Sequence, residues 1–316
     1  MVIAHADWSA HPRKRWMAVA RGSDDALEVS RPCEVGSPET LLQRLAASDD
    51  GPLVIGFDFP LGVPLAYAER AGVKSFRELL GRAGKGELAR FFEPAETPDE
   101  ISIARPFYPR RPGGTRRRQL VDALGLTGFE ELLRRCDRAT SGRGAAAALF
   151  WTLGGQQVGR AAISGWRDVL QPALADPETD IALWPFDGEF DALITDHRIV
   201  VAETYPREAA LQVGLGAPGG SWSKRSQRDR AGKSPQLLRY AERVGLTIDP
   251  ALRGDLEDGF GAGATGEDKF DATLGLLLIA GVLAGRCPPC TPPPGEIRCI
   301  EGWILGQTYP STGEVG

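Results

Sequence analysis

Short apolar runs separated by polar turns dominate the beginning of the chain. Residues 2–8, 16–20 and 26–30 are rich in apolar and aromatic side chains, and only short polar segments lie between them. This pattern predicts three strands in an antiparallel meander. Ser37 and Pro38, a favourable pair for a helix start, precede leucines at helical spacing, so we expect a helix to begin there.

The next apolar run, residues 53–57, ends in Asp58 and is followed by Pro60. A strand that returns through a crossover helix is expected to lie parallel to the first strand. Asp7 and Asp58 would then stand at neighbouring carboxyl ends, about 5 Å apart. Two carboxylates at that distance repel unless a cation joins them, and open parallel sheets bind ligands at this edge. The pattern therefore predicts a cation site.

The middle of the chain changes to a mostly helical pattern over residues 65–174, with a loop at 93–115, and strands resume at 181–184 and 198–202. We interpret the helical part as an insertion between two halves of one sheet. The predicted organisation is a first half of the core (1–64), a helical insertion with a basic loop (65–175), a second half of the core (176–285) and a Pro/Gly-rich tail (286–316).

Acidic residues recur where the later elements end or begin. The strand at 198–202 runs into Glu203, and Pro206 favours the start of a helix. Asp268 and Asp271 open an apolar helix over 266–282 and, three residues apart, share one helix face. Acids are also favoured at helix N-termini by the helix dipole, which is the structural alternative for one of them.

A basic loop at 105–118 surrounds Phe107 and Tyr108 with arginines in a frame of Pro and Gly. Arginine binds phosphates and an aromatic ring stacks on a base, so the loop is a candidate for binding nucleic acid. The alternative is a solvated loop whose arginines pair with the acids at 93–100. The candidate substrate-binding residues are Arg105, Arg110, Arg111, Arg116, Arg117 and Arg118.

Three further features of the sequence are weaker candidates for a functional site. The basic stretch at 221–243 is expected to be a solvated helix face. The G-x-G-x-x-G motif at 261–266 follows no strand and is interpreted as a flexible loop. His5 lies on the same strand face as Asp7, either as a core histidine or as a residue that tunes the site.

Composition narrows the class of protein. The chain has 316 residues, 42% of them hydrophobic, and a formal net charge of −5, which argues against a general nucleic-acid coat but permits a local basic groove. The start of the chain lacks the pattern of a secretory signal, and the apolar segment 272–284 is too short to span a bilayer. We expect a cytoplasmic protein that does not bind membranes. Neither its oligomeric state nor the type of nucleic acid follows from the sequence.

The five cysteines, an odd number, argue against a disulfide framework. Cys287 and Cys290 flank two prolines, but a structural zinc site needs four ligands and only Cys299 lies near them. A proline-rich turn with two free thiols is favoured over a zinc or redox site.

The ordered motifs DWS (7–9), IGFDFPLG (55–62), ETYPR (203–207) and DKFDA (268–272) resemble those of the predicted RNase H-like nucleases, the family called domain of unknown function 429. The resemblance implies an α/β fold with an RNase H-like mixed five-stranded sheet, flanking helices and a largely helical insertion. It marks Asp7, Asp58, Glu203 and Asp271 as catalytic acids and metal ligands, with Asp268 as a further ligand.

The chemistry agrees with this resemblance. Hydrolysis of a phosphodiester by two divalent metals needs several carboxylates, and an all-oxygen site suits Mg²⁺ or Mn²⁺. We therefore expect a metal-dependent nuclease with nucleic acid as its substrate. The alternatives are a nucleotide-dependent phosphotransferase or ATPase of the actin and sugar-kinase type, in which Asp7 and Ser9 would hold phosphate, and a non-catalytic nucleic-acid-binding domain.

Overall fold

The computed structural model describes residues 1–23, 26–113, 115–140, 142–153, 158–216, 219 and 222–309. Its chain is mixed α/β and divides into two compact units. Unit 1 comprises residues 1–58, 179–291 and the chain from 304 on, and unit 2 comprises residues 59–178 and 292–303. Parts of the predicted segments lie outside the described residues, among them Gly114 of the basic loop, residues 141 and 154–157 of the helical insertion, Ser221 of the basic stretch and residues 310–316 of the tail.

Unit 1 is built on one mixed sheet with the strand order β6-β7-β5-β1-β2-β3-β8, and β4 pairs with β2. The meander is confirmed, because β1, β2 and β3 pair antiparallel in sequence. The crossover prediction is also confirmed, because β5 lies parallel to β1. The strands are β1 (Val2–Asp7), β2 (Trp16–Ser23), β3 (Ala26–Val29), β4 (Cys33–Glu34), β5 (Leu53–Phe57), β6 (Ile181–Leu183), β7 (Ile199–Glu203) and β8 (Leu246–Ile248).

The described sheet has eight strands, where the pattern of apolar runs predicted six and the resemblance implied five. Two of the additional ones, β4 and β8, are only two and three residues long. Runs this short cannot show the alternation of apolar and polar positions from which a strand is predicted. They pair at the meander end, where β8 lies parallel to β3.

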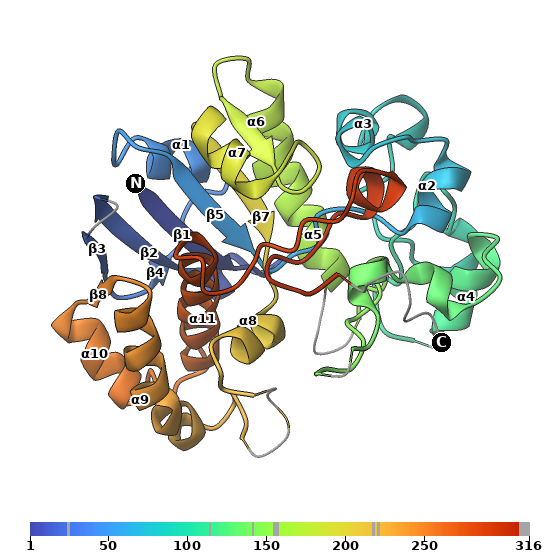
Figure 1. Cartoon of the computed structure of the whole chain (residues 1–316). Coiled ribbons are helices and arrows are strands. Elements are labelled where there is room, and N and C mark those ends of the chain that lie inside the picture. The colour runs from blue at the N-terminus through green and yellow to red at the C-terminus, as the bar shows by residue number, and fades with distance from the viewer. Residues whose placement is uncertain are drawn as a thin grey trace. The chain divides into compact units, whose positions relative to one another are not determined.

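Helices cover both faces of the sheet in unit 1. Figure 1 shows α1 and α7 on one side and α8 to α11 on the other. The helix α11 packs against β1, β2 and β5, and nearly all of its residues are buried, as expected for a helix that is apolar all round. The helices are α1 (Leu41–Ala46), α7 (Phe190–Asp196), α8 (Pro206–Gln212), α9 (Gln227–Arg243), α10 (Pro250–Glu257) and α11 (Gly266–Leu283).

The first helix begins later than predicted. α1 starts at Leu41 after Thr40, not after Ser37. The Ser37 hydroxyl donates a hydrogen bond of 2.7 Å to Glu39 instead of capping a helix. Side chains of this type favour local hydrogen bonds outside helices, and here that competition moves the helix start.

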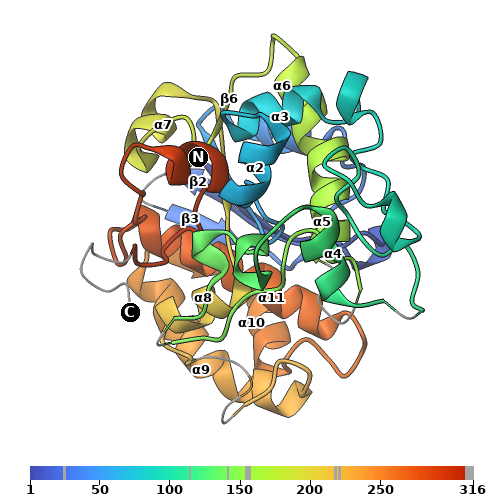
Figure 2. The same ribbon diagram turned by 90° about the vertical axis from the view of Figure 1, so that its right-hand side faces the viewer.

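Unit 2 is less helical than predicted. Its described α-helices are five to eight residues long. A π-helical turn at Trp166–Leu170 joins α5 and α6 without a break, and irregular segments rich in Pro and Gly join the others, as Figure 2 shows for α2 to α5. Aromatic rings fill its core. The centre of the Trp166 ring lies 5.2 Å from that of Phe76 and 6.2 Å from that of Phe91, and the ring centres of Phe107 and Phe150 are 5.2 Å apart. The helices are α2 (Leu65–Ala71), α3 (Phe76–Arg82), α4 (Arg117–Ala123), α5 (Val158–Gly165) and α6 (Gln171–Ala175).

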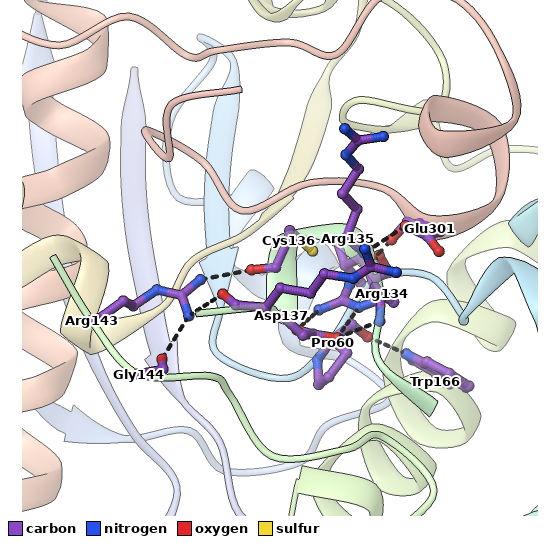
Figure 3. Close-up of polar contacts among 11 residues, drawn as sticks. Pro60, Arg134, Arg135, Cys136, Asp137, Arg143, Gly144, Trp166 and Glu301 are labelled. Atoms are coloured by element: carbon purple, nitrogen blue, oxygen red, sulfur yellow. Dashed lines mark hydrogen bonds and ion pairs between the residues drawn. The ribbon is translucent and has the colours of Figure 1, made fainter. Parts of the chain in front are cut away.

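A buried polar network binds the beginning of unit 2 to its later segments (Figure 3). Arg134 is fully buried, forms two hydrogen bonds of 2.9 Å with Asp137 and donates to the carbonyl of Leu61 at 2.8 Å. Trp166 donates to the carbonyl of Pro60 at 2.7 Å. Each carbonyl thus has a specific donor, as buried backbone groups require.

The tail, which carried little signal in the sequence, takes part in both units. Residues 297–301 form a π-helical turn whose Glu301 carboxylate accepts the backbone N–H groups of Leu65 and Arg135. Gly62 has a φ of +116°, and a Cβ there would lie 2.1 Å from the Glu301 carbonyl oxygen, so only glycine fits. In unit 1, Leu305 donates to the Glu203 carbonyl at 2.9 Å.

No helix in the described part of the chain is long and apolar enough to cross a membrane.

The close approach of α11 to β1 gives a testable prediction. A Cβ at Gly275 would lie 2.3 to 2.4 Å from the ring of His5, which is fully buried. We expect Gly275→Ala to lower the free energy of unfolding by about 1–3 kcal/mol, because the buried ring has no space to move into. Chemical denaturation measures this change.

The matched control is Gly232→Ala within α9, where an added Cβ meets no atom within 4 Å. It is expected to leave stability unchanged or to raise it by up to about 1 kcal/mol through helix propensity. Equal effects of the two substitutions would show that α11 does not pack this closely on β1.

Candidate functional site

Two aspartates lie side by side at the carboxyl ends of β1 and β5. The register pairs Ala6 with Phe57, so Asp7 and Asp58 follow at the same level on strands about 4.8 Å apart. The backbone N–H of Trp8 donates to Asp58 Oδ1 at 2.6 Å and fixes that carboxylate beside the end of β1. Both aspartates are half-buried, so solvent reaches this edge.

The first turns of α11 bring two more carboxylates to the same place. Asp271 is 6% exposed and Asp268 is half-buried. Their charges act on Asp7, as does that of Asp58. We call Asp7, Asp58, Asp268 and Asp271 the acid cluster. The structure thus brings together four of the five acids that the sequence singled out.

Burial and mutual repulsion make the acid cluster difficult to ionise. Burial, followed by the charges of Asp58, Asp271 and Asp268, raises the pKa of Asp7 well above its usual range. Burial also raises the pKa of Asp58 to about 7, although the Trp8 N–H opposes the shift, and it raises the pKa of Asp268 to about 6. Such a group of acids favours a bound cation, which would relieve the repulsion.

Lys224 supplies one positive charge to the acid cluster. Its Nζ donates to Asp271 Oδ2 and lies 3.9 Å from Glu267 Oε1. Burial lowers the pKa of Lys224, but the charge and hydrogen bond of Asp271, with the charges of Asp7 and Glu267, outweigh it, so that the pKa is raised. The other oxygen, Asp271 Oδ1, is buried without a hydrogen-bond partner among the described residues.

Arg230 holds the Lys224 segment in place. Its side chain is 2% exposed and donates to three backbone carbonyls, those of Lys224, Gly259 (2.8 Å) and Gly261 (2.7 Å). The last two belong to the loop before α11. Arg230 therefore joins the segment that carries Lys224 to the start of the helix that carries Asp271.

No pattern in the sequence distinguishes Lys224 or Arg230 from their neighbours. They were assigned with their neighbours to a solvated face, and Arg225 and Arg228 are indeed exposed. What distinguishes Lys224 from these exposed arginines is its contact with Asp271, which lies 47 positions away in the chain. Local charge patterning carries no signal for a contact of this kind.

Glu203 does not lie with the acid cluster. The register pairs it with Phe57, one residue before Asp58, and successive side chains of a strand point to opposite faces. Thr204 lies level with Asp58 instead, and its Cγ2 would be 2.7 Å from a Cβ at Gly56 on that face. The Glu203 side chain is therefore directed to the opposite face, where it is buried.

The arginines of the basic loop belong to unit 2, and several of them have partners there. Arg105 is 5% exposed, pairs with Glu100 at 2.8 Å and donates to the carbonyls of Glu93 and Pro94. Arg110 pairs with Glu96 at 2.6 Å. These two arginines thus pair with upstream acids, as the alternative interpretation of a solvated loop predicted.

The remaining arginines of the loop are exposed. Arg118 pairs with Asp122 at 2.7 Å, and the Arg117 guanidinium lies 5.5 Å from the centre of the Phe129 ring. Arg111 and Arg116 complete the set.

His5 lies in the core, and the buried Cys287 thiol is held protonated. The His5 Nδ1 lies 3.2 Å from the Ala272 carbonyl, and burial lowers its pKa to about 3, so the ring is neutral inside the core. Burial raises the pKa of the Cys287 thiol to about 11, which disfavours the reactive thiolate at neutral pH. The cysteines of the described chain are free.

Asp7 and Asp58 are the two carboxylates that could hold a divalent cation at this edge of the sheet. Among the described residues, no group of three or more His, Cys, Asp or Glu side chains is arranged to hold a metal ion. Mg²⁺, however, is commonly bound by one or two carboxylates and completes its shell with water and substrate phosphate. Asp7 and Asp58, adjacent, oxygen-bearing and half-exposed, fit this kind of site, and Asp271 Oδ1 is an additional free acceptor.

Comparisons with models of protein families, with curated proteins and with solved structures found no match to this chain.

The raised pKa values predict how stability depends on pH. The folded state holds protons on Asp58 and Asp268 that the unfolded chain loses near pH 4, so the free energy of unfolding falls as pH rises from about 4 to 7. Each proton contributes a slope of at most about 1.4 kcal/mol per pH unit. Asp58→Asn should reduce this slope, as measured by denaturation in buffer without divalent cations.

The control is Asp99→Asn, which changes an exposed carboxylate of unit 2 and should leave the slope as it is in the native protein. An unchanged slope in Asp58→Asn would contradict the crowding of charge around Asp58.

Proposed function

We propose that unit 1 is an RNase H-like domain that hydrolyses phosphodiester bonds of nucleic acid with Mg²⁺ or Mn²⁺. The observation that carries the proposal is the pair Asp7 and Asp58, held level at the carboxyl ends of two parallel strands. Ligands of open α/β sheets bind outside these ends. Asp268 and Asp271 add negative charge from α11.

The strand order supports the same proposal. The meander β3-β2-β1 continues through the parallel strands β5 and β7, which gives the mixed five-stranded arrangement implied by the resemblance to predicted RNase H-like nucleases. In this proposal the other three strands extend that core.

The reaction adds water across a phosphodiester bond. The water oxygen bonds to phosphorus, the bond from phosphorus to the leaving oxygen breaks, and the leaving oxygen takes up a proton. A divalent ion, when bound, lowers the pKa of water and neutralises developing negative charge. Asp7 and Asp58 are the residues that would hold it, and the Lys224 ammonium adds positive charge next to Asp271.

For unit 2 by itself, we propose that exposed arginines bind phosphates of nucleic acid. Arg111 and Arg116 are exposed, and neither Arg105 nor Arg110 offers a free guanidinium, because both are paired with glutamates. Arginine binds phosphate through two parallel hydrogen bonds, so exposed guanidinium groups are the better candidates.

The first test is cleavage of single-stranded and double-stranded DNA, RNA and hybrid substrates in the presence of Mn²⁺ or Mg²⁺. Asp7→Asn should lower cleavage by more than about 100-fold, because metal-based stabilisation of the transition state is worth several kcal/mol. The same preparations are tested for ATP turnover.

Glu203→Gln is the matched control for this test, since its side chain is directed to the opposite face of the sheet. It should retain cleavage to within about tenfold, with thermal melting used to correct for any loss of folded protein. Turnover of ATP without cleavage of any nucleic acid would reject the nuclease proposal, as would equal losses in Asp7→Asn and Glu203→Gln.

The arginine proposal has its own test in equilibrium binding of a labelled oligonucleotide. Replacing Arg111 and Arg116 together by serine should weaken binding and reduce the slope of log affinity against log salt by about 1–2, one counterion per lost phosphate contact. Arg90→Ser, which removes an exposed arginine paired with Glu93, is the control. If both proteins lose affinity equally, the loop has no special role.

A further inference from the structure

Lys224 lies among the very carboxylates that would bind metal. Its Nζ contacts Asp271 Oδ2 and lies 3.9 Å from Glu267 Oε1, and only 18% of its side chain is exposed. A buried ammonium in such a place is stable only because carboxylates surround it. It therefore delivers a fixed positive charge to the side of the acid cluster formed by α11.

A second divalent ion would compete with this ammonium. To bind at Asp271 it would have to displace Lys224 from the oxygen it contacts, or accept a like charge at close range. Repulsion between cations at such distances is strong in a partly buried site. The charge of Lys224 also acts on Asp7 and Asp58, but its ammonium contacts Asp271, so an ion at the strand ends would not have to displace it.

The backbone of Lys224 is not free to withdraw. Arg230 binds its carbonyl and, with the same guanidinium, the carbonyls of Gly259 and Gly261 before α11. Arg230 is itself buried, at 2% exposure. The segment is thereby fixed to the helix that carries Asp271, so the ammonium and the carboxylate stay together.

We propose that Lys224 is the second cation of the site, so that unit 1 binds one divalent ion at Asp7 and Asp58 and uses the lysine ammonium in place of another. This inference rests on the proposed function, and it changes the two-metal expectation of the sequence to one metal and one lysine.

The experiment is a titration of the full chain with Mn²⁺, in which free Mn²⁺ is measured by electron paramagnetic resonance and heat by calorimetry. The native protein should bind one ion. Lys224→Met should bind two, because the position near Asp271 becomes free, and Lys224→Arg should bind one, because the charge remains.

Lys269→Met is the matched control. Lys269 lies on α11, two residues before Asp271, but its ammonium lies 4.3 Å from the centre of the Trp16 ring and not on a carboxylate. This variant should still bind one ion. Thermal melting verifies that each variant is folded, and if Lys224→Met does not fold, the native and Lys224→Arg stoichiometries decide.

The outcomes separate the two levels of the proposal. Two ions in the native protein, or one ion in folded Lys224→Met, would overturn the role of Lys224 while leaving a metal-dependent function intact. Two ions in Lys269→Met would overturn it as well, because any nearby positive charge would then have the same effect. No bound Mn²⁺ in the native protein would reject the metal-dependent function itself, and the lysine role with it.

Discussion

The repulsion between Asp7 and Asp58 is the constraint on which the architecture of unit 1 depends. Parallel pairing of β1 and β5 forces the two carboxylates to the same level, and the Trp8 N–H holds one of them there. Their burial raises both pKa values, so the site costs stability whenever it is ionised without a cation. The rest of the sheet and α11 must supply that stability, which fits a helix buried on almost every side.

The positive charges around the acid cluster fall into two kinds. Lys224 contacts a carboxylate directly, whereas Arg230 donates its hydrogen bonds to carbonyl oxygens, positions the segment that carries the lysine, and acts on Asp271 through its charge. The same stretch of chain therefore holds a charge that enters the site and a charge that fixes the backbone. Exposed neighbours such as Arg225 do neither.

Much of the fold could be predicted, because the early strands end in clear polar turns and the crossover rule fixes how β5 returns to β1. The pairing of Asp7 with Asp58 followed directly. Glu203 shows where such reasoning fails. Glu203 is the last residue of β7 and lies level with Phe57, whereas Asp58 is one residue further along. A difference of one residue along a strand places a side chain on the opposite face of the sheet. Lys224 could not be found, because its partner lies on α11 and only tertiary packing brings them together.

The division of the chain also has a consequence for the order of folding. The meander and β5 are synthesised first, but β7 and α11, which complete and cover the sheet, follow only after residues 59–178 of unit 2. Contacts between segments so distant in sequence form late and slowly. During synthesis the apolar face of β1 and β2 remains without α11 until the chain has passed residue 283, and in this interval a nascent chain exposes a surface prone to aggregation. The strands of unit 1 that are synthesised first can therefore complete their packing only after α11 has been synthesised.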